Sequence, residues 1–175
     1  MKIGIIGESG SGIDTLATEL EENYGFQHVS LTDILGHGTS RNQQSEYADT
    51  IRRPRGDSYL VNQALRDAPE DVVLSGICVR AELERIHTIG GVIVGVLATP
   101  KIRYGNIKRQ NEAQGQTTSS YEEFLEQSAR EDAEGADEGR VSVKDADYFV
   151  ANSGTREQFL VATRSLVNIQ LNLRH

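Results

Sequence analysis

The stretch GIIGESGSGIDTLA, residues 4–17, decides the fold of this 175-residue chain. It begins inside a short apolar run, residues 2–7 (KIGIIG), which ends in glycine as a buried parallel strand would. Helical spacing follows over residues 14–24, where Leu16, Ala17, Leu20 and Tyr24 share one face. The sequence therefore predicts a strand and a helix joined by a loop of glycine, serine and glutamate.

The loop has the spacing of a phosphate-binding motif, G-x-x-x-x-G-K-[ST]. Glycines let the chain turn so that consecutive amides point inward as an anion nest, and the helix adds its positive N-terminal end. A tight strand-to-helix turn without a ligand is the structural alternative. On the phosphate-binding interpretation, the predicted cofactor-binding residues are Gly7, Ser9, Gly10, Ser11, Gly12, Ile13, Asp14 and Thr15.

Two positions of the loop depart from the motif. Its lysine, which would reach the terminal phosphates, falls at Ile13, whose apolar side chain cannot replace it. Asp14 stands where a serine or threonine would bind magnesium, and Thr15 follows it. We therefore predict Asp14 and Thr15 as the Mg²⁺ ligands, with the carboxylate acting directly or through water.

The rest of the chain alternates strands with helices. Further strands are predicted over 26–31, 71–77, 91–98 and 147–151, and helices over 42–53, 57–65, 80–86, 102–110 and 120–133. Ser120 with Glu123, and Thr155 with Gln158, predict capping boxes, the second before a last helix. This alternation indicates a three-layer α/β/α domain whose parallel sheet is covered on both faces.

Composition limits the class of protein further. With 37% hydrophobic and 25% charged residues, residues 1–175 fit a single globular domain. A net charge of −8 argues against nucleic acid as the partner, and the longest apolar run, 90–98, is too short to span a membrane. The N-terminus shows no signal-peptide pattern, so we expect a cytoplasmic protein. A single cysteine, Cys78, excludes an internal disulfide.

Six segments, in order and spacing, resemble the P-loop nucleotide kinases, in the branch of adenylate kinase-like, dephospho-CoA kinase-like and deoxynucleoside monophosphate kinase-like proteins. The resemblance covers nearly the whole chain. The segments are SGSGIDTLATEL (9–20), VSLTDIL (29–35), TSRNQQSEYADTIRRPRGDSYL (39–60), VVLSGICVRAELERI (72–86), IRYGNIKRQ (102–110) and DADYFVANSGTREQF (145–159).

This resemblance implies a five-stranded parallel sheet in the order 2-3-1-4-5, with ATP and Mg²⁺ as cofactors. It implies an acceptor-binding region over 36–62, where Asp33 precedes the acceptor site, and a lid over 103–120. Arg103 and Arg109 would close over the transferring phosphoryl group, so these two and Asp33 are the predicted catalytic residues. Asn152 and the loop after it would lie by the adenine. The implied partner is a nucleotide or nucleotide-like small molecule.

Four positions that are charged in that family are neutral here. The lysine is replaced by Ile13, an acceptor-helix arginine by Gly36, and an aspartate and an arginine of the third-strand segment by Ser75 and Cys78. Two hypotheses follow: a nucleotide kinase whose phosphoryl transfer is impaired, or an inactive relative that binds nucleotide as a regulatory protein. The sequence leaves the acceptor and the oligomeric state open.

Overall fold

Five parallel strands form the centre of the protein. The computed structural model describes residues 1–35, 50, 52–137 and 140–172. The strands are β1 (Lys2–Gly7), β2 (Gln27–Ser30), β3 (Val72–Ser75), β4 (Val92–Ala98) and β5 (Tyr148–Asn152). They are hydrogen-bonded in the order β2-β3-β1-β4-β5, which confirms the predicted α/β fold and strand order. Their carboxyl ends share one edge of the sheet, where ligands bind in open parallel sheets.

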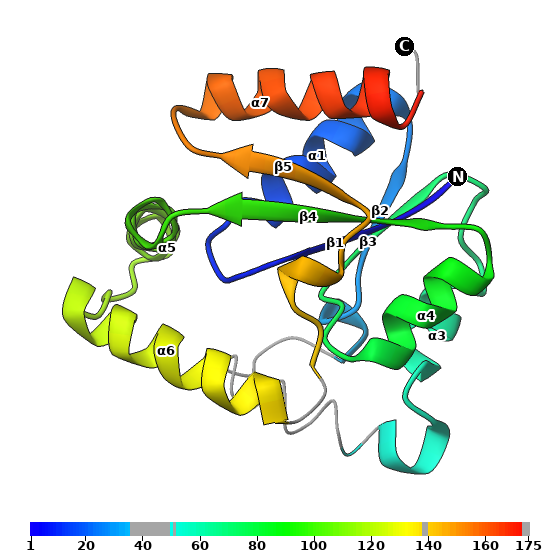
Figure 1. Ribbon diagram of the computed structural model, residues 1–175, viewed down its shortest axis with the longest axis horizontal. Coiled ribbons are helices and arrows are strands. Elements are labelled where there is room, and N and C mark those ends of the chain that lie inside the picture. Colours follow the sequence, from blue (N-terminus) through cyan, green and yellow to red (C-terminus); the bar gives the residue numbers. More distant parts are fainter. Residues whose placement is uncertain (36–49, 51, 138–139, 173–175) are drawn as a thin grey trace.

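Helices cover both faces of this sheet (Figure 1). Helices α1 and α7 lie on one face and α3 and α4 on the other, while α5 begins beyond the tip of β4 and leads to α6. The helices are α1 (Ile13–Tyr24), α3 (Tyr59–Leu65), α4 (Arg80–Thr88), α5 (Pro100–Ala113), α6 (Tyr121–Asp137) and α7 (Arg156–Ser165), with short turns η1 (Asp33–Leu35), η2 (Val143–Asp145) and η3 (Leu166–Gln170). Among the described residues, none of these helices is long and apolar enough to cross a bilayer.

The core divides into two layers because strand side chains alternate between the faces of the sheet. Ile3, Ile5 and Val94 pack with Leu16 of α1 and Phe159 of α7. On the other face a second cluster joins β-strand residues to α3 and α4; its members include Ile6, Leu60, Leu74, Leu83, Ile86 and Ile93. β1 is central: Gly4 pairs with Leu74 of β3 and Ile93 of β4.

Both predicted capping boxes are present. Ser120 Oγ accepts a hydrogen bond from the Glu123 amide at 3.2 Å, and the Glu123 carboxylate accepts one from the Ser120 amide at 2.8 Å. Thr155 and Gln158 make the same reciprocal pair at the start of α7. Each box satisfies amides that have no acceptor within the helix, which fixes where the helix begins.

Several predicted boundaries were wrong by a few residues. α5 begins at Pro100, because Thr99 caps it and proline is tolerated in a first turn, and it continues to Ala113 into the predicted loop. β3 ends at Ser75, because Gly76 has φ +77° and turns the chain away. Of the helix predicted over 42–53, residues 50, 52 and 53 are described and are helical; the remainder, with Gly36, lies outside the described residues.

Candidate phosphate-binding site

The loop after β1 turns back on itself through two left-handed glycines. Gly10 has φ +75° and Gly12 φ +113°, which are conformations that side-chain-bearing residues rarely adopt. Between them, the Ser11 amide donates to the Glu8 carbonyl at 3.0 Å and closes a tight turn. The predicted glycine-rich loop therefore forms at the carboxyl end of the central strand.

Helix α1 starts from this loop without a side-chain cap. Gly12 is its N-cap residue, and the first hydrogen bond of the helix runs from the Leu16 amide to the Gly12 carbonyl at 3.0 Å. The amides of Ile13, Asp14 and Thr15 consequently have no acceptor within the helix. Ser11 adds a hydroxyl that is 1% exposed and has no hydrogen-bond partner among the described residues. Unsatisfied donors at the positive end of a helix are what an anion binds.

Three consecutive carbonyls of the loop accept hydrogen bonds from side chains that lie outside the loop. The Ser9 carbonyl accepts from Arg103 Nε at 2.9 Å, and the Gly10 carbonyl accepts from Asn106 Nδ2 at 2.7 Å. The Ser11 carbonyl accepts from Asn152 Nδ2 at 2.8 Å. Asn152 was predicted beside the adenine; the structure places its amide against the loop, where it is 7% exposed.

The two arginines predicted to close over the phosphoryl group occupy different places. Arg103 is 4% exposed and bonds the loop, with Nη1 paired to Glu8, Nη2 donating to Ser128 at 3.1 Å and the guanidinium over the Phe124 ring at 5.2 Å. Arg109 is exposed, and it donates to the Gly105 carbonyl and to Asn106 Oδ1. Arg103 therefore joins the loop to α6, while Arg109 meets the loop through Asn106.

The predicted magnesium ligands lie in the first turn of α1. The Asp14 side chain is exposed and Thr15 is half-buried. Within the described residues, no group of three or more His, Cys, Asp or Glu side chains forms a cluster that could hold a metal ion by itself. Mg²⁺ is typically held by one or two carboxylates together with substrate phosphates, and Asp14 fits that role. Asp33 is exposed in η1, after β2 at the same edge of the sheet.

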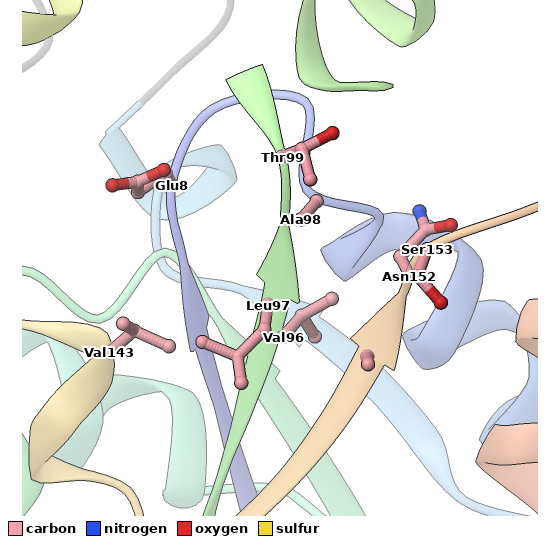
Figure 2. Close-up of a pocket in the computed structure, with 9 residues that line it drawn as sticks. Glu8, Val96, Leu97, Ala98, Thr99, Val143, Asn152 and Ser153 are labelled. Carbon is pink, nitrogen blue, oxygen red and sulfur yellow. The ribbon is translucent and has the colours of Figure 1, made fainter. Parts of the chain in front are cut away.

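A pocket of about 310 Å³ opens beside the loop (Figure 2). Glu8 lies on one side of it and Asn152 and Ser153 on the other, with the end of β4 between them. Its floor is apolar, formed by Val96, Leu97, Ala98, Val143 and Ala151. An apolar pocket with a few polar groups at its rim is a typical small-molecule site, although this one is at the small end of the usual range.

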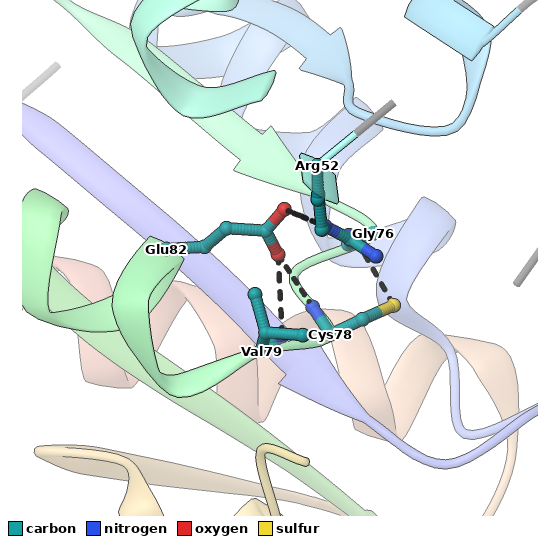
Figure 3. Close-up of polar contacts among 5 residues, drawn as sticks. All are labelled: Arg52, Gly76, Cys78, Val79 and Glu82. Carbon is teal, nitrogen blue, oxygen red and sulfur yellow. Dashed lines mark hydrogen bonds and ion pairs between the residues drawn. The ribbon is translucent and has the colours of Figure 1, made fainter. Parts of the chain in front are cut away.

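A buried ion pair connects the predicted acceptor region to the segment after β3 (Figure 3). Arg52 is 5% exposed and Glu82 is fully buried, and both Nε and Nη2 of Arg52 donate to Glu82 Oε1, at 3.1 and 2.8 Å. The other carboxylate oxygen accepts from the amides of Cys78 at 2.9 Å and Val79 at 3.3 Å. One carboxylate therefore holds an arginine and caps α4.

The neutral positions noted in the sequence make specific contacts. Ile13 packs against the apolar cluster between the sheet and α1. Ser75 Oγ is hydrogen-bonded to His28 Nε2 at 2.9 Å, and Ser75 is buried. The Cys78 thiol donates to the Gly76 carbonyl at 3.3 Å, and its side chain is exposed.

Sequence reasoning missed three contributors to the site: Asn106, the partner Glu8 of Arg103, and the pairing of Arg52 with Glu82. Asn106 and Glu82 do fall inside segments that resemble the kinase family. Their long-range partners, however, are 96 and 30 residues away. No local pattern encodes such distances, so their roles could be assigned only from the folded chain.

Comparison with known proteins agrees with this arrangement at the level of the fold. No protein-family model and no curated protein sequence matches the chain. Among solved structures, a shikimate kinase from Bacteroides thetaiotaomicron superimposes with a TM-score of 0.66 at 16% identity, over 98% of each chain. A gluconokinase from Sinorhizobium meliloti 1021 gives 0.59 at 15% identity, over 99% of this chain and 97% of the other.

A third structure, shikimate kinase from Acinetobacter baumannii in complex with shikimate, gives a TM-score of 0.57 at 13% identity and covers 98% of this chain and 93% of that one. At such low identities the likeness establishes the fold alone. The chain has the P-loop kinase fold, with its glycine-rich loop at the carboxyl end of the central strand β1.

The packing of Gly10 gives a direct test of the loop's conformation. A Cβ atom at Gly10 would overlap the Arg103 carbonyl oxygen and lie 3.0 Å from Ile107 Cγ1. We expect Gly10→Ala to lower the free energy of unfolding by roughly 2–4 kcal/mol, the sum of left-handed strain and overpacking. The measurement is chemical denaturation. Gly25→Ala is the matched control: its φ is +73°, with no atom within 4 Å. Equal losses in both variants would contradict the close contact with α5.

The buried ion pair gives a second test. Glu82→Gln keeps the shape of the side chain but removes the charge that neutralises Arg52, so we expect a loss of about 3 kcal/mol in unfolding free energy. Glu112→Gln is the control, because Glu112 pairs with Lys108 at 3.9 Å on the exposed face of α5. That variant should stay within about 0.5 kcal/mol of wild type. Similar effects of the two substitutions would show that the buried pair does not stabilise the fold.

Proposed function

We propose that this protein binds ATP or a related nucleotide at the loop of residues 7–15, and that its transfer of the terminal phosphoryl group to a nucleotide-like small molecule is impaired. The observation on which binding rests is the uncapped start of α1 inside a loop with two left-handed glycines. Backbone amides and a helix N-terminus bind phosphate without needing a lysine.

The residues around the loop favour a nucleotide, rather than a simple anion, as the bound ligand. The pocket bounded by Glu8 and Asn152 adjoins the loop and has an apolar floor suited to a planar base. Asp14 and Thr15, in the first turn of α1, would hold Mg²⁺ together with the bound phosphates. When bound, magnesium would supply positive charge that offsets the charge of the phosphate oxygens.

Impaired transfer is inferred from the charges around the loop. Ile13 packs against the core where the motif has its lysine, and Arg103 is paired with Glu8. The transition state of phosphoryl transfer is stabilised mainly by positioned positive charge. Loss of one such contact lowers the rate by about 10²–10³-fold. Arg103 would have to leave Glu8 before it could serve as a clamp.

The alternative is a protein that binds nucleotide and performs no transfer, acting as a regulatory or interaction protein. One observation favours it: the neutral residues that replace charged ones are well accommodated. Ser75 is hydrogen-bonded to His28, and Ile13 fills apolar space. The two functions share the binding step and differ in turnover, so an experiment on turnover separates them.

The first prediction of this proposal is that the wild-type protein binds ADP and ATP in the presence of Mg²⁺, measured by titration calorimetry. Phosphoryl transfer should remain below ~1 s⁻¹, the lower end of ordinary enzyme turnover. A coupled assay would offer nucleoside monophosphates and dephospho-CoA as acceptors. Shikimate and gluconate belong in the panel, since kinases named for them share the fold.

Each outcome decides between the two functions or against both. Binding with slow but acceptor-dependent transfer supports an impaired kinase, and binding with no transfer to any acceptor supports the regulatory alternative. Turnover above ~1 s⁻¹ would contradict impairment. Failure of the folded protein to bind any nucleotide would contradict the proposal itself.

The position of the missing lysine gives a second prediction. We expect Ile13→Lys to tighten ATP binding by about tenfold, because a lysine there adds a charge-assisted hydrogen bond to the terminal phosphates. Titration calorimetry with ATP and with AMP measures the change, which should be confined to ATP. Ile13→Met is the matched control, since it has similar length without the charge. Equal affinities of the two variants for ATP would show that the side chain at position 13 does not reach the phosphates.

A further inference from the structure

We propose that Asn106 is a positioning residue that holds the loop of residues 7–15 in its anion-binding conformation, and that Arg109 acts on the loop through Asn106. The inference rests on the proposed binding of phosphate at this loop. In this proposal α5 does not replace the charge that the lysine of the usual motif brings to the phosphate; it fixes the conformation of the loop against which the phosphate binds.

The first step of the argument is the geometry of a peptide unit. In a planar trans peptide the carbonyl and the following amide N–H point in opposite directions. The carbonyls of Ser9, Gly10 and Ser11 are each bonded to a side chain outside the loop. The amides of Gly10, Ser11 and Gly12 therefore each point away from the side chain that holds the preceding carbonyl. The peptide that Asn106 holds carries the Ser11 amide, which donates to the Glu8 carbonyl and closes the turn. Asn106 thus acts on the anion site by fixing this turn, from which the start of α1 follows.

The second step is that hydrogen bonds at both the oxygen and the nitrogen of the Asn106 side-chain amide determine its orientation. Its Oδ1 accepts from Arg109 Nη2 at 2.6 Å, and its Nδ2 donates to the Gly10 carbonyl at 2.7 Å. A flipped amide would set Nδ2 against the guanidinium, which has only donors, and Oδ1 against a carbonyl. Arg109 is in turn tied to the Gly105 carbonyl one helical turn earlier. Arg109 thereby prevents the flip that would release Gly10.

The third step is that Asn106 holds the loop at a residue that lies directly against α5. Gly10 lies so close to α5 that a Cβ would overlap the Arg103 carbonyl, so the loop and the helix are in backbone contact. Asn106 is half-buried beside that contact. Its hydrogen bond joins the loop to α5, and hydrogen bonds in series strengthen one another. The charge of Arg109 therefore polarises the amide that holds Gly10.

The experiment measures the affinity of wild type and Asn106→Asp for inorganic tripolyphosphate, by titration calorimetry. Asp is isosteric with Asn and keeps the contact with Arg109, but it places a carboxylate oxygen against the Gly10 carbonyl. We expect about tenfold weaker binding, the equivalent of one lost hydrogen bond together with a repulsive contact. Asn106→Gln, which retains the amide donor, should recover part of the loss.

Asn111→Asp is the matched control. Asn111 lies on the same helix, and its Nδ2 donates to Thr118 Oγ1 rather than to the loop. The same charge change there should alter tripolyphosphate affinity by less than about twofold. A second readout is the amide resonances of Gly10, Ser11 and Gly12 in ¹⁵N–¹H spectra, which should shift in Asn106→Asp before ligand is added and remain in place in Asn111→Asp.

Arg109 is exposed, so Arg109→Gln tests the inference even if Asn106→Asp does not fold. We expect about threefold weaker tripolyphosphate binding, against no comparable change in Lys108→Gln, which removes a neighbouring charge of α5. Equal losses in these two variants would indicate general electrostatic attraction and overturn the role of Asn106. Wild-type affinity in both Asn106→Asp and Arg109→Gln would also overturn it and leave phosphate binding intact. A wild-type protein that binds no tripolyphosphate would overturn the proposed function and this inference together.

Discussion

The close contact between Gly10 and the backbone of α5 is the constraint on which the candidate site depends. A glycine with φ +75° at this position lets the loop lie directly against the Arg103 carbonyl. That approach brings Arg103 and Asn106 within hydrogen-bonding distance of the Ser9 and Gly10 carbonyls. α5 follows β4, whose register with β1 is set by five paired residues. The loop is consequently positioned by the strand beside it as much as by its own sequence.

The buried arginines near the site contact carboxylates of the protein, whereas the resemblance to nucleotide kinases implies that arginines here contact phosphate. Two buried arginines lie near the site, and each is paired with a carboxylate: Arg103 with Glu8, and Arg52 with Glu82. Both pairs join segments far apart in the chain. Only the pair of Arg52 and Glu82 is buried on both sides, because the Glu8 side chain is 41% exposed. Such a buried pair requires good geometry to offset the loss of hydration, and removal of one partner leaves a costly charge. These arginines therefore stabilise the architecture of the site, and a role in binding phosphate would require exchange of their partners.

The sequence predicted the fold because its local signals were strong. The apolar run of β1, the glycine spacing and the two capping boxes are each encoded within a few residues, and all formed as predicted. Boundaries were less accurate where a tertiary contact or a glycine conformation decides them, as at Gly76 and Pro100. The roles of Asn106 and Glu82 were not predictable, because each depends on a partner brought close only by the sheet. The placement of Arg103 was likewise visible only in the fold, since its partners are in the loop and in α6.

The neutral residues Ile13 and Ser75 stand where the kinase family that the sequence resembles has charged residues. A charged residue lost from a site by recent substitution leaves a gap or an unsatisfied partner behind. Neither is found at these two described positions: Ile13 packs with the apolar cluster over the sheet, and Ser75 and His28 satisfy one another. Among the described residues of the loop, the buried hydroxyl of Ser11 has no hydrogen-bond partner, and α1 begins without a side-chain cap. The two replaced positions, in contrast, are accommodated by contacts within the protein, so the fold does not depend on a charged residue at either one.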